Sequence, residues 1–237
     1  MGQDFLSNTE LFYSTQIFAN ELKLDSDEFH HCVRVMRHSI GDKIFVTNGQ
    51  GEIYHSIIES IGKNEIIAEI LERMYYEDNF KNIHLCFPVL KSNERTEFAI
   101  EKCVELGITN FIFFQSKYSL QKKIKISRLE KIALAAMKQS LRSWKPNLEI
   151  LSSLQSLFNL EGEKFIFDQN ANSVFNNEFL VKNIFNDGKK KYLILGPEGG
   201  LTSQEISLTT NLCRLTTNRL RSETAIISVA VILNQGL

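Results

Sequence analysis

The chain has 237 residues, of which 43% are hydrophobic and 23% charged, with 27 lysine and arginine residues against 28 aspartate and glutamate residues. This content suits a globular protein of one large or two modest domains, and the near-neutral total argues against a uniformly basic nucleic-acid binder. The amino terminus lacks a basic and then apolar leader, and the longest near-apolar run, residues 226–233, is too short to span a bilayer, so we expect a cytoplasmic protein with no membrane partner.

Neither the cysteines nor the histidines predict a metal site. The four cysteines are scattered and include no Cys-x-x-Cys pair, so we expect reduced thiols in the core rather than a zinc site or a disulfide framework. All five histidines fall within the first 84 residues, but the adjacent His30 and His31 cannot point the same way from a helix. We therefore expect no bound metal.

Residues 11–72 have the pattern of a small β-rich unit. Asp25 followed by Glu28 predicts the capped start of a short helix that runs through Met36. Glycine-rich turns at residues 48–51 and 62–64 then separate short apolar segments with the spacing of hairpin strands. Short strands at this spacing indicate a compact barrel.

A histidine and two arginines at the predicted helix could meet a phosphate. On a helix, His31, Arg34 and Arg37 lie three residues apart on roughly one face. The same spacing fits an exposed polar face with His31 stacked on the barrel. The residues alone leave both interpretations open.

After the polar stretch at residues 75–79, which is the best candidate for a domain boundary, strands and helices alternate. Ser92 is a candidate cap for one helix, and Ser127 with Glu130 is a candidate cap for another at residues 129–141. The alternation predicts a mostly parallel sheet covered on both faces, with ligands at the carboxyl ends of its strands. The expected strands are residues 83–89, 110–114, 164–167, 192–195 and 211–215.

A local excess of positive charge interrupts this neutral chain. Residues 117–145 contain nine lysine and arginine residues and one acid, Glu130. A charge run of this kind is often a solvated helix face, but one with so few acids favours an anionic partner.

A glycine-rich turn follows the predicted strand at residues 192–195. Residues 196–200 read Gly-Pro-Glu-Gly-Gly, and Thr202 with Glu205 forms a capping-box pattern at the next helix start. Such a turn presents free backbone N–H groups to a ligand, although an ordinary glycine-rich turn is the simpler alternative. A second signal, residues 218–225, opens the last apolar helix and favours the ligand site.

These motifs, in this order, resemble the SPOUT superfamily of knotted methyltransferases and, nearly end to end, the ribosomal RNA small subunit methyltransferase E family. The matching residues are His31-x-x-x-Val35-x-Arg37, Gly41-Asp42, Asn48-Gly49, Lys91, Lys102-x-x-Glu105-Leu106-Gly107, Gln139-Ser140-x-Arg142, Pro146, Gly196 to Gly200 with Glu205, and Leu220-Arg221-x-Glu223-Thr224-Ala225.

The resemblance implies an architecture and an activity. It implies a PUA-like RNA-binding β-barrel at residues 1–74 and an α/β SPOUT domain at residues 75–237, tied in a deep trefoil knot. Family members act as homodimers that use S-adenosylmethionine to methylate N3 of a uridine in the 16S rRNA of the small ribosomal subunit. There are two alternatives. The chain could be a ribosome-assembly or RNA-binding factor that has lost catalysis, or a methyltransferase that acts on another RNA position.

The resemblance also implies which residues form the site. It places Arg221 next to the reacting base, where a cation could orient phosphate or stabilise the uracil anion. Glu198 and Glu223 are weaker candidates for a base, and we favour loop bracing and helix capping for them. The implied RNA contacts are His31, Arg34, Arg37, Lys91, Lys117, Lys122, Lys123 and Arg142. The implied cofactor contacts are Leu195, Gly196, Pro197, Glu198, Gly199, Gly200, Leu215, Thr217, Asn218, Arg219, Leu220 and Thr224.

The chain departs from the family pattern at three positions. Thr216 stands where the family usually has glycine, Tyr118 replaces a usual arginine, and Ser222 replaces the common threonine. None of these changes removes the centre of the expected cofactor site.

Overall fold

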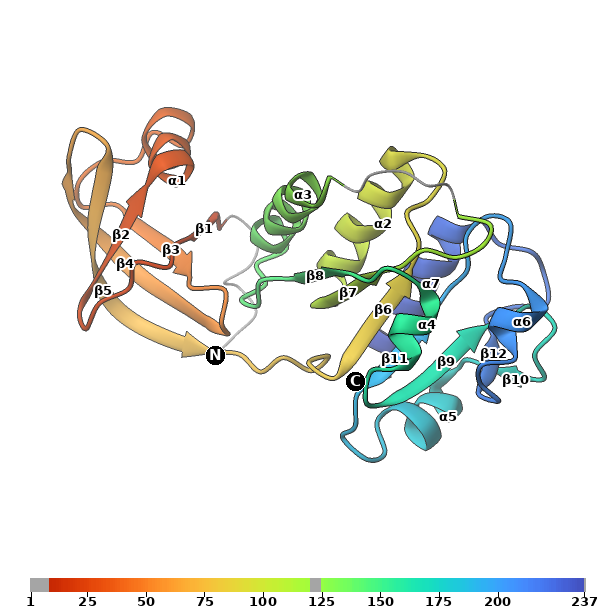
Figure 1. The fold of residues 1–237 in the computed structure, drawn as a ribbon. Helices are drawn as coiled ribbons and strands as arrows, with labels where there is room; N and C mark the ends of the chain where they lie inside the picture. Colours follow the sequence, from red (N-terminus) through yellow and green to blue (C-terminus); the bar gives the residue numbers. More distant parts are fainter. Residues whose placement is uncertain (1–8, 120–124, 237) are drawn as a thin grey trace. The chain divides into compact units, whose positions relative to one another are not determined.

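A computed structural model describes residues 9–119 and 125–236 and divides the chain into two compact units (Figure 1). The first unit comprises the chain up to Asp78 together with Met137–Lys145, and the second comprises Asn79–Ala136 and the chain from Pro146 onward. Within the described ranges, no helix combines the length and the apolar character that crossing a membrane requires.

The first unit is built on a five-stranded sheet. The order β1-β3-β4-β5-β2 is antiparallel except for the parallel pair β1 and β3. The two glycine-rich turns predicted from the sequence connect β3 to β4 and β4 to β5, as expected. Alternate residues of the strands, such as Ile44 and Val46, face a shared apolar core. The strands are β1 (Leu11–Tyr13), β2 (Glu21–Asp25), β3 (Lys43–Thr47), β4 (Glu52–Ile61) and β5 (Glu65–Tyr75).

The helical segment of this unit differs from the prediction in its cap, and Arg37 lies beyond its end. It consists of α1 (Ser26–His30) and the π-helix η2 (His31–Val35). Asp25 precedes α1, but its side chain makes no capping bond and instead accepts a 2.5 Å hydrogen bond from Gln16. Arg37 has left the helix and adopts a φ of 60°. His31, Arg34 and Arg37 therefore do not share one helical face.

A distant segment completes the first unit. In Met137–Lys145, the backbone N–H of Lys145 donates to Gly49, and that of Gly51 donates to Ser143, at 2.9 and 3.0 Å. A Cβ on Gly51 would lie 2.7 Å from the Trp144 ring, so only glycine permits this approach. The sequence did not predict that these residues pack with the amino-terminal unit.

The second unit is built on a seven-stranded parallel sheet of order β10-β12-β9-β11-β6-β7-β8. All five predicted strands are present, whereas β8 and β10 were not predicted. The strands are β6 (Ile83–Phe87), β7 (Asn110–Phe113), β8 (Asn147–Ile150), β9 (Glu163–Phe167), β10 (Ser173–Val174), β11 (Lys191–Ile194) and β12 (Leu212–Arg214).

Helices cover both faces of this sheet, as the sequence predicts. Leu154 and Leu157 of α4 pack on one face, while α2 and α7 pack together on the other (Figure 1). The buried, free thiols predicted from the cysteine spacing are confirmed. The helices of the described chain from Asn79 onward are α2 (Asn93–Glu105), α3 (Ile126–Gln139), α4 (Leu154–Phe158), α5 (Asn177–Phe179), the π-helix η3 (Leu180–Ile184), α6 (Ser203–Ile206) and α7 (Ser222–Gln235).

The predicted helix starts differ in outcome. Thr202 and Glu205 form the predicted reciprocal capping box at α6, in which the Glu205 N–H donates to Thr202 Oγ1 at 3.2 Å and the Thr202 N–H donates to Glu205 at 2.7 Å. Ser92 precedes α2, but its side chain makes no capping bond. The Ser127 cap is wrong, because α3 begins at Ile126 and Ser127 lies inside its first turn.

Candidate functional site

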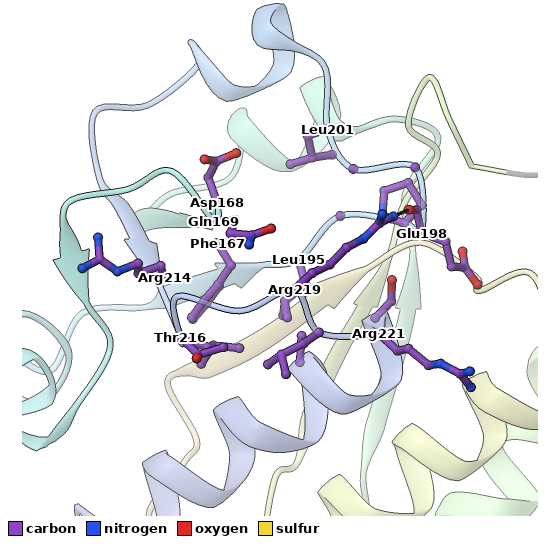
Figure 2. Close-up of a pocket in the computed structure, with 18 of the residues that line it drawn as sticks. Phe167, Asp168, Gln169, Leu195, Glu198, Leu201, Arg214, Thr216, Arg219 and Arg221 are labelled. Carbon is purple, nitrogen blue, oxygen red and sulfur yellow. Dashed lines mark hydrogen bonds between the residues drawn. The ribbon is translucent and has the colours of Figure 1, made fainter.

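A cavity of about 620 Å³ lies in the second unit at the carboxyl ends of β9, β11 and β12 (Figure 2). These strands are parallel neighbours in the sheet, and each is followed by a loop that forms one wall of the cavity. The lining residues are Arg95, Phe167, Asp168, Gln169, Asn170, Leu195, Gly196, Pro197, Glu198, Gly199, Gly200, Leu201, Arg214, Leu215, Thr216, Asn218, Arg219, Leu220, Arg221, Ser222 and Ala225.

The loop after β11 is the glycine-rich turn predicted from the sequence. Gly200 has a φ of 74°, and its N–H donates to the carbonyl of Pro197 at 2.8 Å, which closes a tight turn. A Cβ on Gly196 would lie 3.2 Å from the Gly200 backbone, closer than most side chains tolerate. The turn therefore brings bare backbone to the cavity, and the capping box of α6 fixes its far end.

The loop after β12 reaches the glycine-rich turn. Nη2 of Arg219 lies 3.5 Å from the carbonyl oxygen of Glu198, and Figure 2 shows the Arg219 side chain extended toward it. Thr216, one of the three departures expected from the resemblance, accepts a 3.3 Å hydrogen bond from the N–H of Asn218. The loop thus uses the threonine side chain within its own turn. The glycine-rich turn after β11 and the loop after β12, both indicated by the sequence, therefore form two walls of one cavity.

The third wall, formed by Phe167 at the end of β9 and residues 168–170 after it, was missed by the sequence analysis. The Asp168 N–H donates to the Cys213 carbonyl at 2.9 Å, and Gln169 Nε2 donates to the Thr217 carbonyl at 3.2 Å, so this loop is joined to β12 and to the loop that follows it. The signal was available, because the strand at 164–167 was predicted and polar residues follow its carboxyl end.

The two candidate glutamate bases are both engaged by neighbouring groups. Oε1 of Glu198 accepts a 2.8 Å hydrogen bond from the backbone N–H of Lys91. Oε1 of Glu223 lies 3.5 Å from Nε of Arg95, while its Oε2 is buried and has no hydrogen-bond partner among the described residues. Arg95 lines the cavity and was also missed by the sequence analysis. The Lys91 contact fits the loop bracing favoured for Glu198. Glu223 lies in the first turn of α7 and contacts Arg95, so the helix capping favoured for it stays a prediction.

Cations outnumber anions around the cavity. Arg221 is exposed at the residue that precedes α7, and Figure 2 shows it on the Glu198 side, opposite Arg214. An Arg214 Nη1 donates to the carbonyl of Ala171 and so fixes the guanidinium to the chain after β9. Four arginines line the cavity with two acids, Asp168 and Glu198. This balance favours an anionic group near the rim.

Most of the expected cofactor residues meet in this cavity. Thr217 and Thr224 are not among the residues that line it, although the Thr217 carbonyl accepts the bond from Gln169. The expected cofactor residues that do line it are Leu195, Gly196, Pro197, Glu198, Gly199, Gly200, Leu215, Asn218, Arg219 and Leu220, together with Arg221.

The expected RNA contacts are distributed over both units. Lys91 and Lys117 are exposed in the second unit, and the backbone N–H of each donates to a glutamate of the loop after β11 or of α6. Arg142 is half-buried in the first unit, where desolvation lowers the pKa of its guanidinium. His31, Arg34 and Arg37 also lie in the first unit. Lys122 and Lys123 lie outside the described residues.

The predicted stripe of free positive charge is partly neutralised. Arg128 makes a bidentate ion pair with Glu97 at 2.5 and 2.8 Å, and Lys138 pairs with Glu28 at 2.5 Å. The acids come from outside the stripe, which is why the local count overestimated its charge. In the described part of the chain, no cluster of three or more His, Cys, Asp or Glu residues could hold a metal ion.

Two family models match the chain in the order that the sequence predicts. An RNA methyltransferase PUA domain matches residues 24–71, and an RNA methyltransferase domain matches residues 77–234. The PUA-like amino-terminal domain and the SPOUT-like α/β domain are thereby confirmed.

Individual proteins match along most of their length. A ribosomal RNA small subunit methyltransferase E from Mesomycoplasma hyopneumoniae is 30% identical over 202 residues, or 79% of this chain and 84% of the relative. The solved structure of a probable rRNA-methyltransferase from Porphyromonas gingivalis is 25% identical, with a TM-score of 0.82 and coverage of 96% and 98%. A Neisseria gonorrhoeae ribosomal RNA small subunit methyltransferase E bound to S-adenosyl methionine shares the fold at 23% identity, with the same TM-score and coverage.

Proposed function

The chain belongs to the ribosomal RNA small subunit methyltransferase E family, and from this membership we propose that it methylates N3 of a uridine in 16S rRNA with S-adenosylmethionine. The observation that carries the proposal is the cavity at the ends of β9, β11 and β12. Its walls include both loops that the family resemblance assigns to the cofactor. The small ribosomal subunit is the expected partner, and the cytoplasm is the expected location.

The cavity fits a nucleoside-sized cofactor. Its volume of about 620 Å³ lies within the range of roughly 300–1,000 Å³ that is usual for small-molecule sites. The close packing at Gly196 and the left-handed φ of Gly200 bring backbone groups to its surface, where a side chain would fill the space. Asp168 and Glu198 supply acidic groups that suit a donor carrying a sulfonium and an ammonium.

The chemistry requires placement more than covalent participation by the protein. S-adenosylmethionine would supply an electrophilic methyl carbon bonded to a positively charged sulfur. Uridine N3 loses its proton to solvent or to a base and forms a bond to that carbon, while the carbon–sulfur bond breaks and its electron pair goes to sulfur. Holding N3 in line with the methyl carbon can contribute about 7–11 kcal/mol.

Arg221 is suited to stabilise the charge that develops on the base. Loss of the N3 proton places negative charge on the uracil ring and its carbonyl oxygens, and a guanidinium nearby lowers the energy of that anion. Arg221 is exposed at the cavity and precedes α7, whose amino-terminal dipole adds to the positive potential. Glu198 and Glu223 brace Lys91 and Arg95 rather than serving as the base.

RNA contact would involve both units. In the first unit, Arg34 and Arg37 are exposed around the end of η2, and His31 packs 5.6 Å from the Phe12 ring. In the second unit, Lys91 and Lys117 are exposed on segments that are hydrogen-bonded to the loop after β11 or to the box that caps α6. We assign phosphate contacts to these residues, with Arg142, Lys122 and Lys123 as further members of the set.

We also propose that the protein is a homodimer and that its α/β domain contains a trefoil knot. Ile227 and Val231 of α7 are half-buried and lie four residues apart, on a face turned away from its core residues Ile226 and Ala230. Phe98 of α2 is 49% exposed. Apolar side chains on these two packed helices support pairing with a second copy, which would complete the site.

The test combines 16S rRNA analysis with cofactor binding. Deletion of the gene should remove 3-methyluridine from 16S rRNA, and the purified protein should restore it on small subunits from the deletion strain, as measured by mass spectrometry. Retained 3-methyluridine in the deletion strain would overturn the substrate assignment. RNA binding without calorimetrically detectable S-adenosylmethionine binding would instead indicate an assembly factor that has lost catalysis.

A further inference from the structure

Tyr118 is an exposed aromatic residue that contacts the glycine-rich loop of the cavity at Gly199, although it is not itself one of the lining residues. Its side chain is 54% exposed, and no described residue stacks on its ring or hydrogen-bonds its hydroxyl group. A Cβ placed on Gly199 would lie 3.0 Å from Cβ and 3.5 Å from Cγ of Tyr118. The tyrosine therefore rests on the glycine-rich loop, and the absence of a side chain at Gly199 permits this contact.

The backbone of this segment is held in place on both sides of Tyr118. The Lys117 N–H donates to Glu205 Oε1 at 3.1 Å, and the other oxygen of Glu205 accepts the 2.7 Å bond from Thr202 in the capping box. The N–H of Ser119 donates to the Ser116 carbonyl at 3.1 Å, and the Ser116 N–H donates to Ser119 Oγ at 3.0 Å. An exposed ring on such a fixed turn needs little further ordering to bind a flat partner.

The partner that fits this ring is a nucleobase. Glu198, the neighbour of Gly199, lies on the same side of the cavity as Arg221 (Figure 2). Lys117, next to Tyr118, adds an exposed cation. An aromatic ring beside cations is the combination that holds an unstacked base and its phosphates. Resting on the proposed function, we propose that Tyr118 is a positioning residue on which the target pyrimidine stacks beside the methyl donor.

Tyr118 offers a stacking contact rather than an ionic one. An arginine at this position would instead pair with phosphate through its guanidinium. A tyrosine lacks that charge but offers a flat face that holds a base without selecting its identity. Selection of uridine then falls to the groups that contact its edge.

The first test compares Tyr118→Phe with Tyr118→Leu in the full-length protein, on small subunits from the deletion strain. Y118L should lower kcat/KM about 5- to 150-fold, the range expected for loss of one base stack, while Y118F stays within about threefold of wild type. The calorimetric Kd for S-adenosylmethionine should stay within about twofold for both. Equal activity of Y118L and wild type, or equal losses in Y118F and Y118L, would overturn the proposal. A parallel loss of cofactor affinity in Y118L would also overturn it.

A second measurement does not require turnover. Tyr118→Trp should place an indole at the same site, and its fluorescence should be quenched when 16S rRNA or the small subunit binds, with wild type as the control for Trp144. No quenching on a bound complex would contradict stacking, even if Y118L proved unstable. If wild type binds RNA but does not methylate it, the proposed function is wrong. The role of Tyr118 can still be tested in that case, by the fluorescence quenching and by comparing the RNA affinities of Y118F and Y118L.

Discussion

The backbone N–H of Lys91 donates to the carboxylate of Glu198 at 2.8 Å, which ties the segment after β6 to the glycine-rich loop of the cavity. Because α2 begins at Asn93, this bond fixes the loop against the start of that helix. Glu198 is thereby an acceptor of a structural hydrogen bond, and its role can be separated from that of a catalytic base.

For Glu198, we expect different results from two substitutions. Glu198→Gln retains an acceptor for Lys91 and should keep kcat within about threefold of wild type. Glu198→Ala removes the acceptor and should weaken S-adenosylmethionine binding by several-fold, since one such bond contributes about 1 kcal/mol. Calorimetry and single-turnover kinetics measure the two effects. A drop of about 100-fold in kcat for E198Q, with normal cofactor binding, would identify Glu198 as the base.

The close packing at Gly196 predicts a selective loss of cofactor binding. Gly196→Ala would place a Cβ 3.2 Å from the Gly200 backbone, so the loop must widen, and we expect S-adenosylmethionine affinity to fall at least about tenfold. The cost in folding stability should be about 1–3 kcal/mol, as for other overpacked sites. Gly62→Ala is the matched control, because its nearest contact would be an ordinary 3.4 Å. Unchanged affinity in G196A would show that the cofactor does not need this turn.

Arg221 should affect turnover more than binding. Arg221→Ala should lower kcat about 100-fold, the usual effect of removing one group that stabilises developing negative charge, with cofactor affinity within about threefold of wild type. Arg221→Lys keeps a charge without the planar fork and should retain intermediate activity. Methylation assays quenched at fixed times measure kcat, and calorimetry measures cofactor affinity, so the two effects can be separated. A defect confined to cofactor binding would mean that Arg221 holds the donor.

Arg34 and Arg37 should contribute to RNA binding through charge. Each alanine substitution should reduce the slope of log K against log salt concentration by about 1, because one phosphate contact is lost. Lys23→Ala is a control in the same unit, since Lys23 pairs with Glu65 at 3.4 Å. Titrations of 16S rRNA fragments at several salt concentrations measure the slopes. Slopes equal to that of wild type would remove these arginines from the RNA contact.

His84 predicts a loss of folding stability in acid. Burial, aided by the charge of Lys190, lowers the His84 pKa to about 4 from 6.5, and its Nδ1 has no hydrogen-bond partner among the described residues. The unfolded chain therefore binds the proton more tightly than the folded protein. Stability is full above pH 6.5 and falls between pH 6.5 and 4, by on the order of 2 kcal/mol, because solvent screening of this half-buried ring reduces the roughly 3 kcal/mol that the full change in pKa would give. His84→Gln should flatten this part of a denaturant-unfolding profile. An identical pH profile would show that another group controls it.

The strands and the capping box were predictable because each depends on local chemistry. The box at Thr202 needs two side chains three residues apart, and the apolar segment before it needs only burial in a sheet. Asp25 has the same local pattern at α1, yet its carboxylate bonds to Gln16 instead. The sequence pattern does not show whether the Asp25 carboxylate will accept a hydrogen bond from the helix backbone or from Gln16.

Other parts of the site depend on contacts that no local pattern carries. Arg95 reaches the cavity through the packing of α2 beside α7, where it meets Glu223. Asp168 enters because β9 lies between β11 and β12 in the sheet, an order that follows from tertiary structure. Likewise, the segment Met137–Lys145 packs with the first unit although the chain has already passed the predicted boundary.

The three walls of the cavity are separate loops attached to adjacent strands, so a ligand touching all of them acts as a non-covalent clamp on the open end of the sheet. At a concentration 100 times its Kd, such a ligand adds about 2.7 kcal/mol to the free energy of unfolding. Because proteases cleave opened chains, a bound methyl donor would also slow the proteolysis of this protein.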